Sequence, residues 1–83
     1  MTEEKAIEIA RAFLVACGKG HMLGRIIAVR HIDADFRRRT EGAVPKGHRD
    51  HWTVCYDVVG EPGMSFGVLI DEETGEARGW SAP

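Results

Sequence analysis

The sequence predicts an α+β domain in which an N-terminal helix packs across an antiparallel sheet of three or four strands. Residues 3–17 carry apolar side chains at helical spacing, whereas residues 52–59 and 66–70 alternate large apolar side chains with smaller or polar ones. The elements follow the order helix, strand, long loop, strand, strand and short strand. With 83 residues, the chain is expected to form one domain over residues 1–83.

The helix has a start signal, an apolar stripe and a stop signal. The hydroxyl of Thr2 can accept a hydrogen bond from an early backbone N–H, and Glu3 complements the positive end of the helix dipole. Gly18 and Gly20 supply a left-handed C-terminal cap, so the helix is expected to end near Cys17. The stripe that should face the sheet consists of Ala6, Ile7, Ile9, Ala10, Phe13, Leu14 and Cys17.

The two alternating segments predict an antiparallel hairpin, because a Gly-Glu-Pro-Gly turn separates them. A second turn at residues 71–76 leads to a short strand at 77–80. The helix should cover the face on which the large side chains of the hairpin lie. The expected core is therefore Trp52, Val54, Tyr56, Phe66, Val68 and Ile70, together with Ile9, Phe13 and Leu14.

The first strand is predicted at residues 25–32, which are rich in β-branched side chains. Its register stays open, because Ile26 and Ile27 are adjacent and break the alternation. If Ile27 and Val29 face the helix, then Ile26 and Ile32 lie on the far side.

Composition argues for a cytoplasmic protein without membrane association. The formal net charge of −2 gives no overall attraction to nucleic acid or anionic lipid. The first residues lack the pattern of a signal peptide, and no apolar run approaches the ~20 residues that span a bilayer. Cys17 and Cys55 are too few for a disulfide scaffold and are expected to be reduced, buried thiols.

Residues 33–50 are irregular and predict a long loop, which contains five of the eleven basic residues: Arg37, Arg38, Arg39, Lys46 and Arg49. This basic loop could contact phosphates, with Trp52 as a stacking surface, so nucleic-acid binding through residues 37–49 is one alternative function. The acidic neighbours Asp33, Asp35 and Glu41 favour instead a solvated loop with internal ion pairs.

A metal or thiol site around His48, His51 and Cys55 is a second alternative. The H-x-x-H spacing of the two histidines sends their rings toward opposite faces of an extended segment. Neither cysteine lies in a nucleophile motif, and the carboxylates at 71–73 lie on a solvated turn. We therefore expect no enzyme activity, no bound metal and no cofactor.

The preferred function is binding of a protein partner, or self-association, through the face of the sheet that the single helix leaves uncovered. This face should carry Thr53, Cys55, Asp57 and Leu69, with Ile26 or Ile27 beside them. The expected contact residues are Ile27, Thr53, Leu69, Arg37, Arg38 and Arg39. In a competing interpretation, the loop at 33–50 folds back over this face through Phe36 and Val44.

The sequence also resembles small helix-plus-sheet modules in three segments, TEEKAIEIARAFL, HWTVCYDVV and FGVLIDEETGEARGW. Similar W-x-V-x-[YF] strands and V-x-I-D-x-x-T-G-E hairpins occur in nuclear-transport-factor-like immunity proteins and in PepSY-like domains. The resemblance involves Trp52, Val54, Tyr56, Val68, Ile70, Asp71, Thr74 and Gly75. It implies a cystatin-like fold, with Asp71 and Thr74 bonding turn amides, and transfers no activity. Residues 18–49 lie outside it and are where a partner would be chosen.

Overall fold

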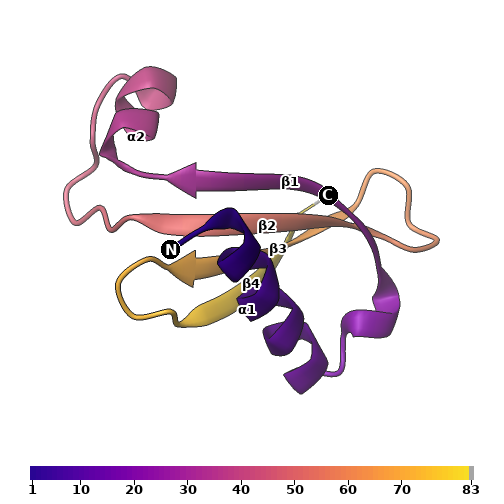
Figure 1. Cartoon of the computed structure of the whole chain (residues 1–83). Helices are drawn as coiled ribbons and strands as arrows, with labels where there is room; N and C mark the ends of the chain where they lie inside the picture. Colours follow the sequence, from indigo (N-terminus) through magenta and orange to yellow (C-terminus); the bar gives the residue numbers. More distant parts are fainter. Residues whose placement is uncertain (83) are drawn as a thin grey trace.

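The structure is a computed structural model that describes residues 1–82, with side chains through Trp80. In chain order its elements are α1 (Glu3–Ala16), the 3-10 helix η1 (Gly20–Met22), β1 (Leu23–Ile32), α2 (Ala34–Glu41), β2 (His51–Val58), β3 (Ser65–Asp71) and β4 (Ala77–Ala82). The strands form one antiparallel sheet in the order β1-β2-β3-β4, and α1 crosses one of its faces (Figure 1). The predicted α+β class is confirmed, with four strands.

Helix α1 begins and ends where the sequence predicts. The Thr2 hydroxyl accepts a hydrogen bond from the backbone N–H of Lys5 at 3.1 Å, and Gly18 follows the helix with a left-handed φ of 68°. Cys17, however, is exposed, so the prediction that it is buried is wrong. It is the residue that caps the helix after Ala16 and lies past the last turn that packs on the sheet.

The core lies between α1 and the inner face of the sheet, and all of the predicted core residues belong to it. Alternation along β2 and β3 places Val54 opposite Val68 on this inner face. The buried side chains are Ala6, Ala10, Leu14, Val54, Tyr56, Val68 and Ile70, and those packed around them include Ile9, Phe13, Trp52 and Phe66. The inner face is thus closed by α1, which leaves the outer face for other contacts.

Strand β1 contains an irregularity, which determines which of its residues face α1. The sequence had left this register open. Ile26 pairs with Tyr56 but Ala28 already pairs with Cys55, so β1 contains one residue more than β2 over this stretch. Such a β-bulge shifts the side chains that follow it to the opposite faces. Ile26 therefore lies beside α1, and Ile27 lies at the bulge with 55% of its surface exposed.

The predicted loop over residues 33–50 is wrong in its first half, where the chain forms α2. The carboxylate of Asp33 caps this helix by accepting a hydrogen bond from the backbone N–H of Phe36 at 2.8 Å. Gly42 ends it in the left-handed conformation at φ 80°, and Arg37 pairs with Glu41 one turn away at 2.7 Å. Local capping and ion pairing therefore stabilise a helix that has almost no apolar stripe.

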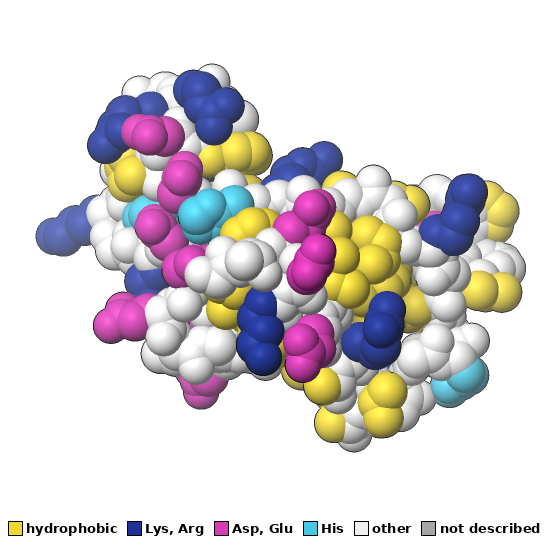
Figure 2. Space-filling view, in the orientation of Figure 1, with side chains coloured by type: hydrophobic (Ala, Val, Ile, Leu, Met, Phe, Trp, Pro, Cys, Tyr) yellow, Lys and Arg dark blue, Asp and Glu magenta, His cyan; other side chains and the backbone are white. Residues whose placement is uncertain are grey.

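The surface on the α1 side is mixed in character. Figure 2 shows hydrophobic side chains gathered between α1 and β1, and lysine or arginine side chains clustered on α2 with acidic side chains nearby. Among residues 1–82, no helix is both long enough and apolar enough to cross a bilayer.

Candidate binding surface

The outer face of the sheet carries three rows of side chains that run across the strands. The strand register defines the central row, in which Arg30 pairs with Thr53, Thr53 with Leu69, and Leu69 with Arg78. The row toward one end is Ala28, Cys55, Gly67 and Trp80, and the row toward the other end is Ile32, His51 and Asp71. This face therefore combines an apolar centre with an arginine at each edge.

Helix α2 borders the outer face and turns it into an open hollow of about 440 Å³. Helix α2 contributes the wall, which consists of Phe36, Arg37 and Glu41. Thr53 and Leu69 lie on the sheet. The complete lining is Arg30, Ile32, Phe36, Arg37, Glu41, His51, Thr53, Cys55, Leu69 and Trp80. The competing interpretation of the 33–50 segment is thus correct for Phe36, which borders this face, whereas Val44 is not part of the lining.

Trp80 reaches its place in the hollow because its cross-strand neighbour is a glycine. A Cβ atom at Gly67 would lie 2.3 Å from the Trp80 ring, so the ring covers the bare backbone of β3. The residue remains 40% exposed. A large aromatic surface, half open to solvent, therefore lies at one end of the hollow.

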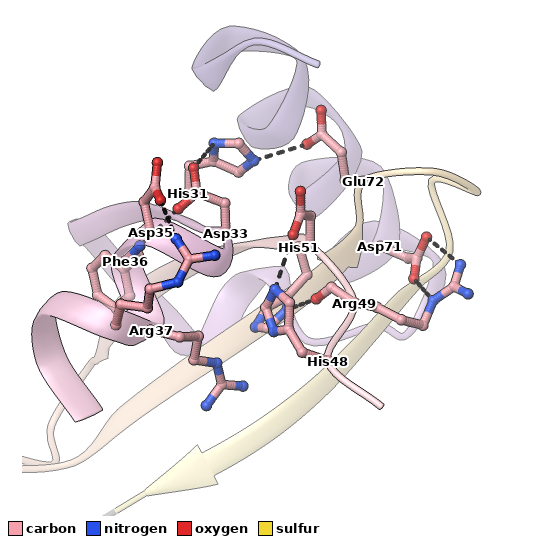
Figure 3. Close-up of polar contacts among 12 residues, drawn as sticks. His31, Asp33, Asp35, Phe36, Arg37, His48, Arg49, His51, Asp71 and Glu72 are labelled. Carbon is pink, nitrogen blue, oxygen red and sulfur yellow. Dashed lines mark hydrogen bonds and ion pairs between the residues drawn. The ribbon is translucent and has the colours of Figure 1, made fainter. Parts of the chain in front are cut away.

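At the other end of the outer face, Arg49 and Asp71 form an ion pair with two hydrogen bonds. The guanidinium donates from Nε at 2.7 Å and from Nη2 at 3.1 Å to the two carboxylate oxygens of Asp71 (Figure 3). The backbone N–H groups of Glu73 and Thr74 donate to the same carboxylate at 2.9 Å each. Arg49 and these turn amides hold the pKa of Asp71 well below its usual range.

The next residue along, Glu72, makes its contacts on the α1 side of the sheet. Its carboxylate accepts hydrogen bonds from the Trp52 indole and, at 2.9 Å, from the amino group of Met1. His31 stacks on Trp52 with ring centroids 4.6 Å apart, and its Nε2 lies 3.5 Å from Glu72 (Figure 3). These contacts fix the start of the chain to the β3–β4 turn and lie away from the outer face.

The predicted contact residues divide into two groups. Thr53, Leu69 and Arg37 line the same hollow, although they come from β2, β3 and α2. Arg38 pairs with Asp35 on α2, and Arg39 lies over the Phe36 ring at 5.9 Å. Neither of these two arginines, nor Ile27 at the bulge, lines the hollow.

Sequence reasoning missed Arg30, Arg78 and Trp80, which come from the two edge strands. The alternation of Arg78 and Trp80 around Gly79 was a usable signal, because residues two apart on a strand share a face. Their position relative to Thr53 and Leu69 depends on strand register, which the sequence alone does not give.

The residues of the suggested metal or thiol site each have other neighbours. His48 Nε2 lies 2.9 Å from an Asp50 carboxylate oxygen, and His51 Nδ1 lies 2.8 Å from the carbonyl oxygen of Arg49. Cys55 lies in the hollow beside Thr53. In the part of the chain that the structure describes, no three or more histidine, cysteine or acidic side chains are grouped to hold a metal ion.

Asp71→Asn is expected to reduce the sensitivity of the fold to acid. A carboxyl whose pKa is lower in the folded than in the unfolded chain stabilises the fold fully above its unfolded pKa of about 4. That stabilisation is lost as the pH falls through the lower, folded pKa. Urea denaturation over a pH series should show the variant less stable than wild type at neutral pH and less dependent on pH below about 4.

Asp35→Asn is the matched control for this substitution, because it removes a carboxylate that is 77% exposed on α2. The comparison separates the loss of the Arg49–Asp71 contacts from the loss of a carboxylate as such. Equal pH dependence of the Asp71 variant and wild type would contradict a stabilising role of the Arg49–Asp71 pair.

Comparisons with known proteins leave the family of the chain open. No family model, no curated protein and no solved structure matches it significantly. Function therefore has to be argued from the surface itself.

Proposed function

We propose that this chain is a non-enzymatic module that binds a protein partner on the outer face of its sheet. The observation that carries the proposal is the 440 Å³ hollow, lined by half-buried Leu69 and Thr53 and by exposed Trp80 beside α2. A monomeric protein normally covers such a face or makes it polar, so an open face with an aromatic and an aliphatic side chain is typical of an interface.

The chemistry of the hollow indicates what kind of partner surface fits it. Arg30 and Arg78 lie at opposite ends of the central row, and Arg37 lies on the wall from α2. Between them the floor is apolar or weakly polar. A complementary partner presents an apolar side chain flanked by carboxylates, because charge complementarity at the rim directs association while the apolar centre supplies most of the affinity.

Nucleic acid fits this surface less well, although Trp80 could stack a base. Arg37, Arg38 and Arg49 each form an ion pair with a carboxylate of the same chain, at distances from 2.5 to 2.7 Å. These pairs offset much of the charge that a phosphate backbone would need. Their presence favours a protein partner over the alternative of nucleic-acid contact.

The likeness to small immunity proteins and PepSY-like domains concerns the fold and transfers no activity. It covers α1 and the β2–β4 region, and the residues of the hollow that come from β1 and α2 lie outside it. We therefore propose that β1 and α2 select the partner. Two free cysteines, Cys17 and Cys55, fit a reducing compartment such as the cytoplasm.

A photo-crosslinking side chain placed at Thr53 tests the proposal in the cells that make the protein. The expected product is a protein adduct that forms from Thr53 and is lost when Arg78→Glu reverses a rim charge. The same crosslinker at Glu8, exposed on α1, is the matched control and should give no such adduct.

The mass of the adduct identifies the partner, and an adduct of twice the chain mass means self-association. Equal adducts from Thr53 and Glu8, or an adduct that survives charge reversal at Arg78, would contradict docking on this face. An adduct removed by nuclease would establish the nucleic-acid alternative instead. Thermal melting of Arg78→Glu shows whether the variant is folded, since Arg78 is exposed.

A further inference from the structure

A second hollow on the outer face, of about 340 Å³, has a lining in which six of ten residues are cationic or histidine. It lies between α2, the segment before β2 and the edge strand β4. Its lining is Arg37, Pro45, Lys46, Gly47, His48, Arg49, His51, Leu69, Asp71 and Arg78. Asp71 is the single carboxylate in this lining, and Arg49 already binds it through two hydrogen bonds.

Two of the four cations in this hollow are left without an acidic partner. Arg37 pairs with Glu41 at 2.7 Å and Arg49 with Asp71 at 2.7 Å. Lys46 and Arg78 form no ion pair with any residue among 1–82. The hollow therefore presents two positive charges that the chain itself does not neutralise.

Buried nitrogen atoms in the same hollow also lack hydrogen-bond partners. The side chain of His48 is only 7% exposed, and its Nδ1 is buried without a partner within the described part of the chain. Because Nε2 donates to Asp50 at 2.9 Å, this Nδ1 is an acceptor in the neutral ring. The Nε–H of Arg37 is likewise buried and unpartnered. Figure 3 shows Arg37 reaching from α2 toward the side of the sheet where His48 and His51 lie. Buried polar atoms normally have a partner, so the Arg37 N–H in this basic hollow points to a ligand that accepts hydrogen bonds.

We infer that this hollow is a phosphate-binding site, formed by Lys46 and Arg78 as the unpaired charges and by Arg37 as a hydrogen-bond donor. A phosphate monoester carries close to two negative charges at neutral pH, which matches the two unpaired cations. It also offers three acceptor oxygens. A dianion with several acceptors can satisfy side chains from three different segments at once, which a single carboxylate cannot do.

Inorganic phosphate is the probe that tests this site without any knowledge of the physiological ligand. Titration at constant ionic strength, followed by NMR of the histidine rings and backbone amides, should give saturable shifts at His48, His51 and Arg78. The double variant Lys46→Gln, Arg78→Gln should bind phosphate ~10-fold more weakly or not at all, because it loses both unpaired charges.

The matched control is the double variant Lys5→Gln, Arg25→Gln, which makes the same change in net charge on other surfaces. Lys5 lies on α1, and Arg25 lies on β1 beside Asp57. This control should bind phosphate as wild type does. Equal weakening in both double variants, or shifts that never saturate, would reduce the effect to general charge screening and overturn the site.

The source of the phosphate group is distinguished by two further ligands, a small sugar phosphate and a phosphoserine peptide. Tighter binding of the sugar phosphate would assign a metabolite, whereas tighter binding of the peptide would assign a modified partner chain that extends over Leu69. Both outcomes support phosphate recognition. The phosphate titration does not involve the docking partner, so a negative titration leaves the docking proposal at Thr53 intact. A negative crosslinking experiment at Thr53 likewise leaves the phosphate site intact.

Discussion

Replacing Ile70 with alanine is expected to destabilise the domain by about 2–5 kcal/mol, the usual cost of a large-to-small substitution in a packed core. Ile70 is fully buried and lies in β3 between Trp52 of β2 and Ala77 of β4. Small domains are stable by roughly 5 kcal/mol at the lower end of the usual range. The variant should therefore keep at most about 3 kcal/mol of stability and unfold at a much lower urea concentration than wild type, as measured by urea denaturation followed by circular dichroism.

Ile27→Ala is the matched control, because it removes the same atoms from a side chain that is 55% exposed. Its exposed position at the bulge of β1 predicts a loss within about 0.5 kcal/mol, the range of most surface substitutions. Similar losses for the two isoleucines would mean that the bulge is absent and that Ile27 packs under α1.

The core could be predicted from the sequence because β2 and β3 keep an unbroken period of two. Trp52, Val54 and Tyr56 fall on one face, and that face is the one that α1 covers. β1 could not be assigned in the same way. Its bulge adds a residue between Ile26 and Ala28, so the periodicity changes phase within the strand.

Helix α2 was missed for a different physical reason. An amphipathic pattern reveals a helix only when one side of the helix is buried, and Phe36 is the sole large apolar residue in the eight residues of α2. The local signals were present, since Asp33 can cap the start and Gly42 can end the helix. Capping residues were therefore the informative feature in this polar segment, rather than hydrophobic periodicity.

The candidate binding surface was predicted in part, through Thr53 and Leu69. Both follow from the alternation of β2 and β3, which assigns residues to faces. Predicting the arginines at the rim would have required the strand register, which defines the residues that lie opposite each other. Predicting the 440 Å³ hollow would have required the position of α2, which forms its wall. The alternation within one β-strand thus assigns its residues to a face of the sheet. A site on that face also depends on tertiary contacts, which a sequence pattern does not contain.

Gly79→Ala is expected to cost about 1–3 kcal/mol, the usual effect of adding a methyl group to a filled space. Gly79 lies on the inner face of β4, opposite Val68. A Cβ atom there would lie 2.6 Å from the Phe66 ring and 3.3 Å from the Phe13 ring. Both rings are partly buried against the core under α1, so moving them away from the added methyl group loses packing contacts.

Gly67→Ala is the matched comparison, because its Cβ atom would meet the Trp80 ring at 2.3 Å on the opposite face of the sheet. Trp80 is 40% exposed and can swing into solvent, so this variant should lose less stability than Gly79→Ala. Thermal melting of both variants gives the order of stability, and the NMR signal of the Trp80 indole N–H should move toward that of a solvated indole in Gly67→Ala alone. A larger loss for Gly67→Ala than for Gly79→Ala would show that Trp80 is fixed in place, and that the outer hollow is packed more rigidly than its exposure indicates.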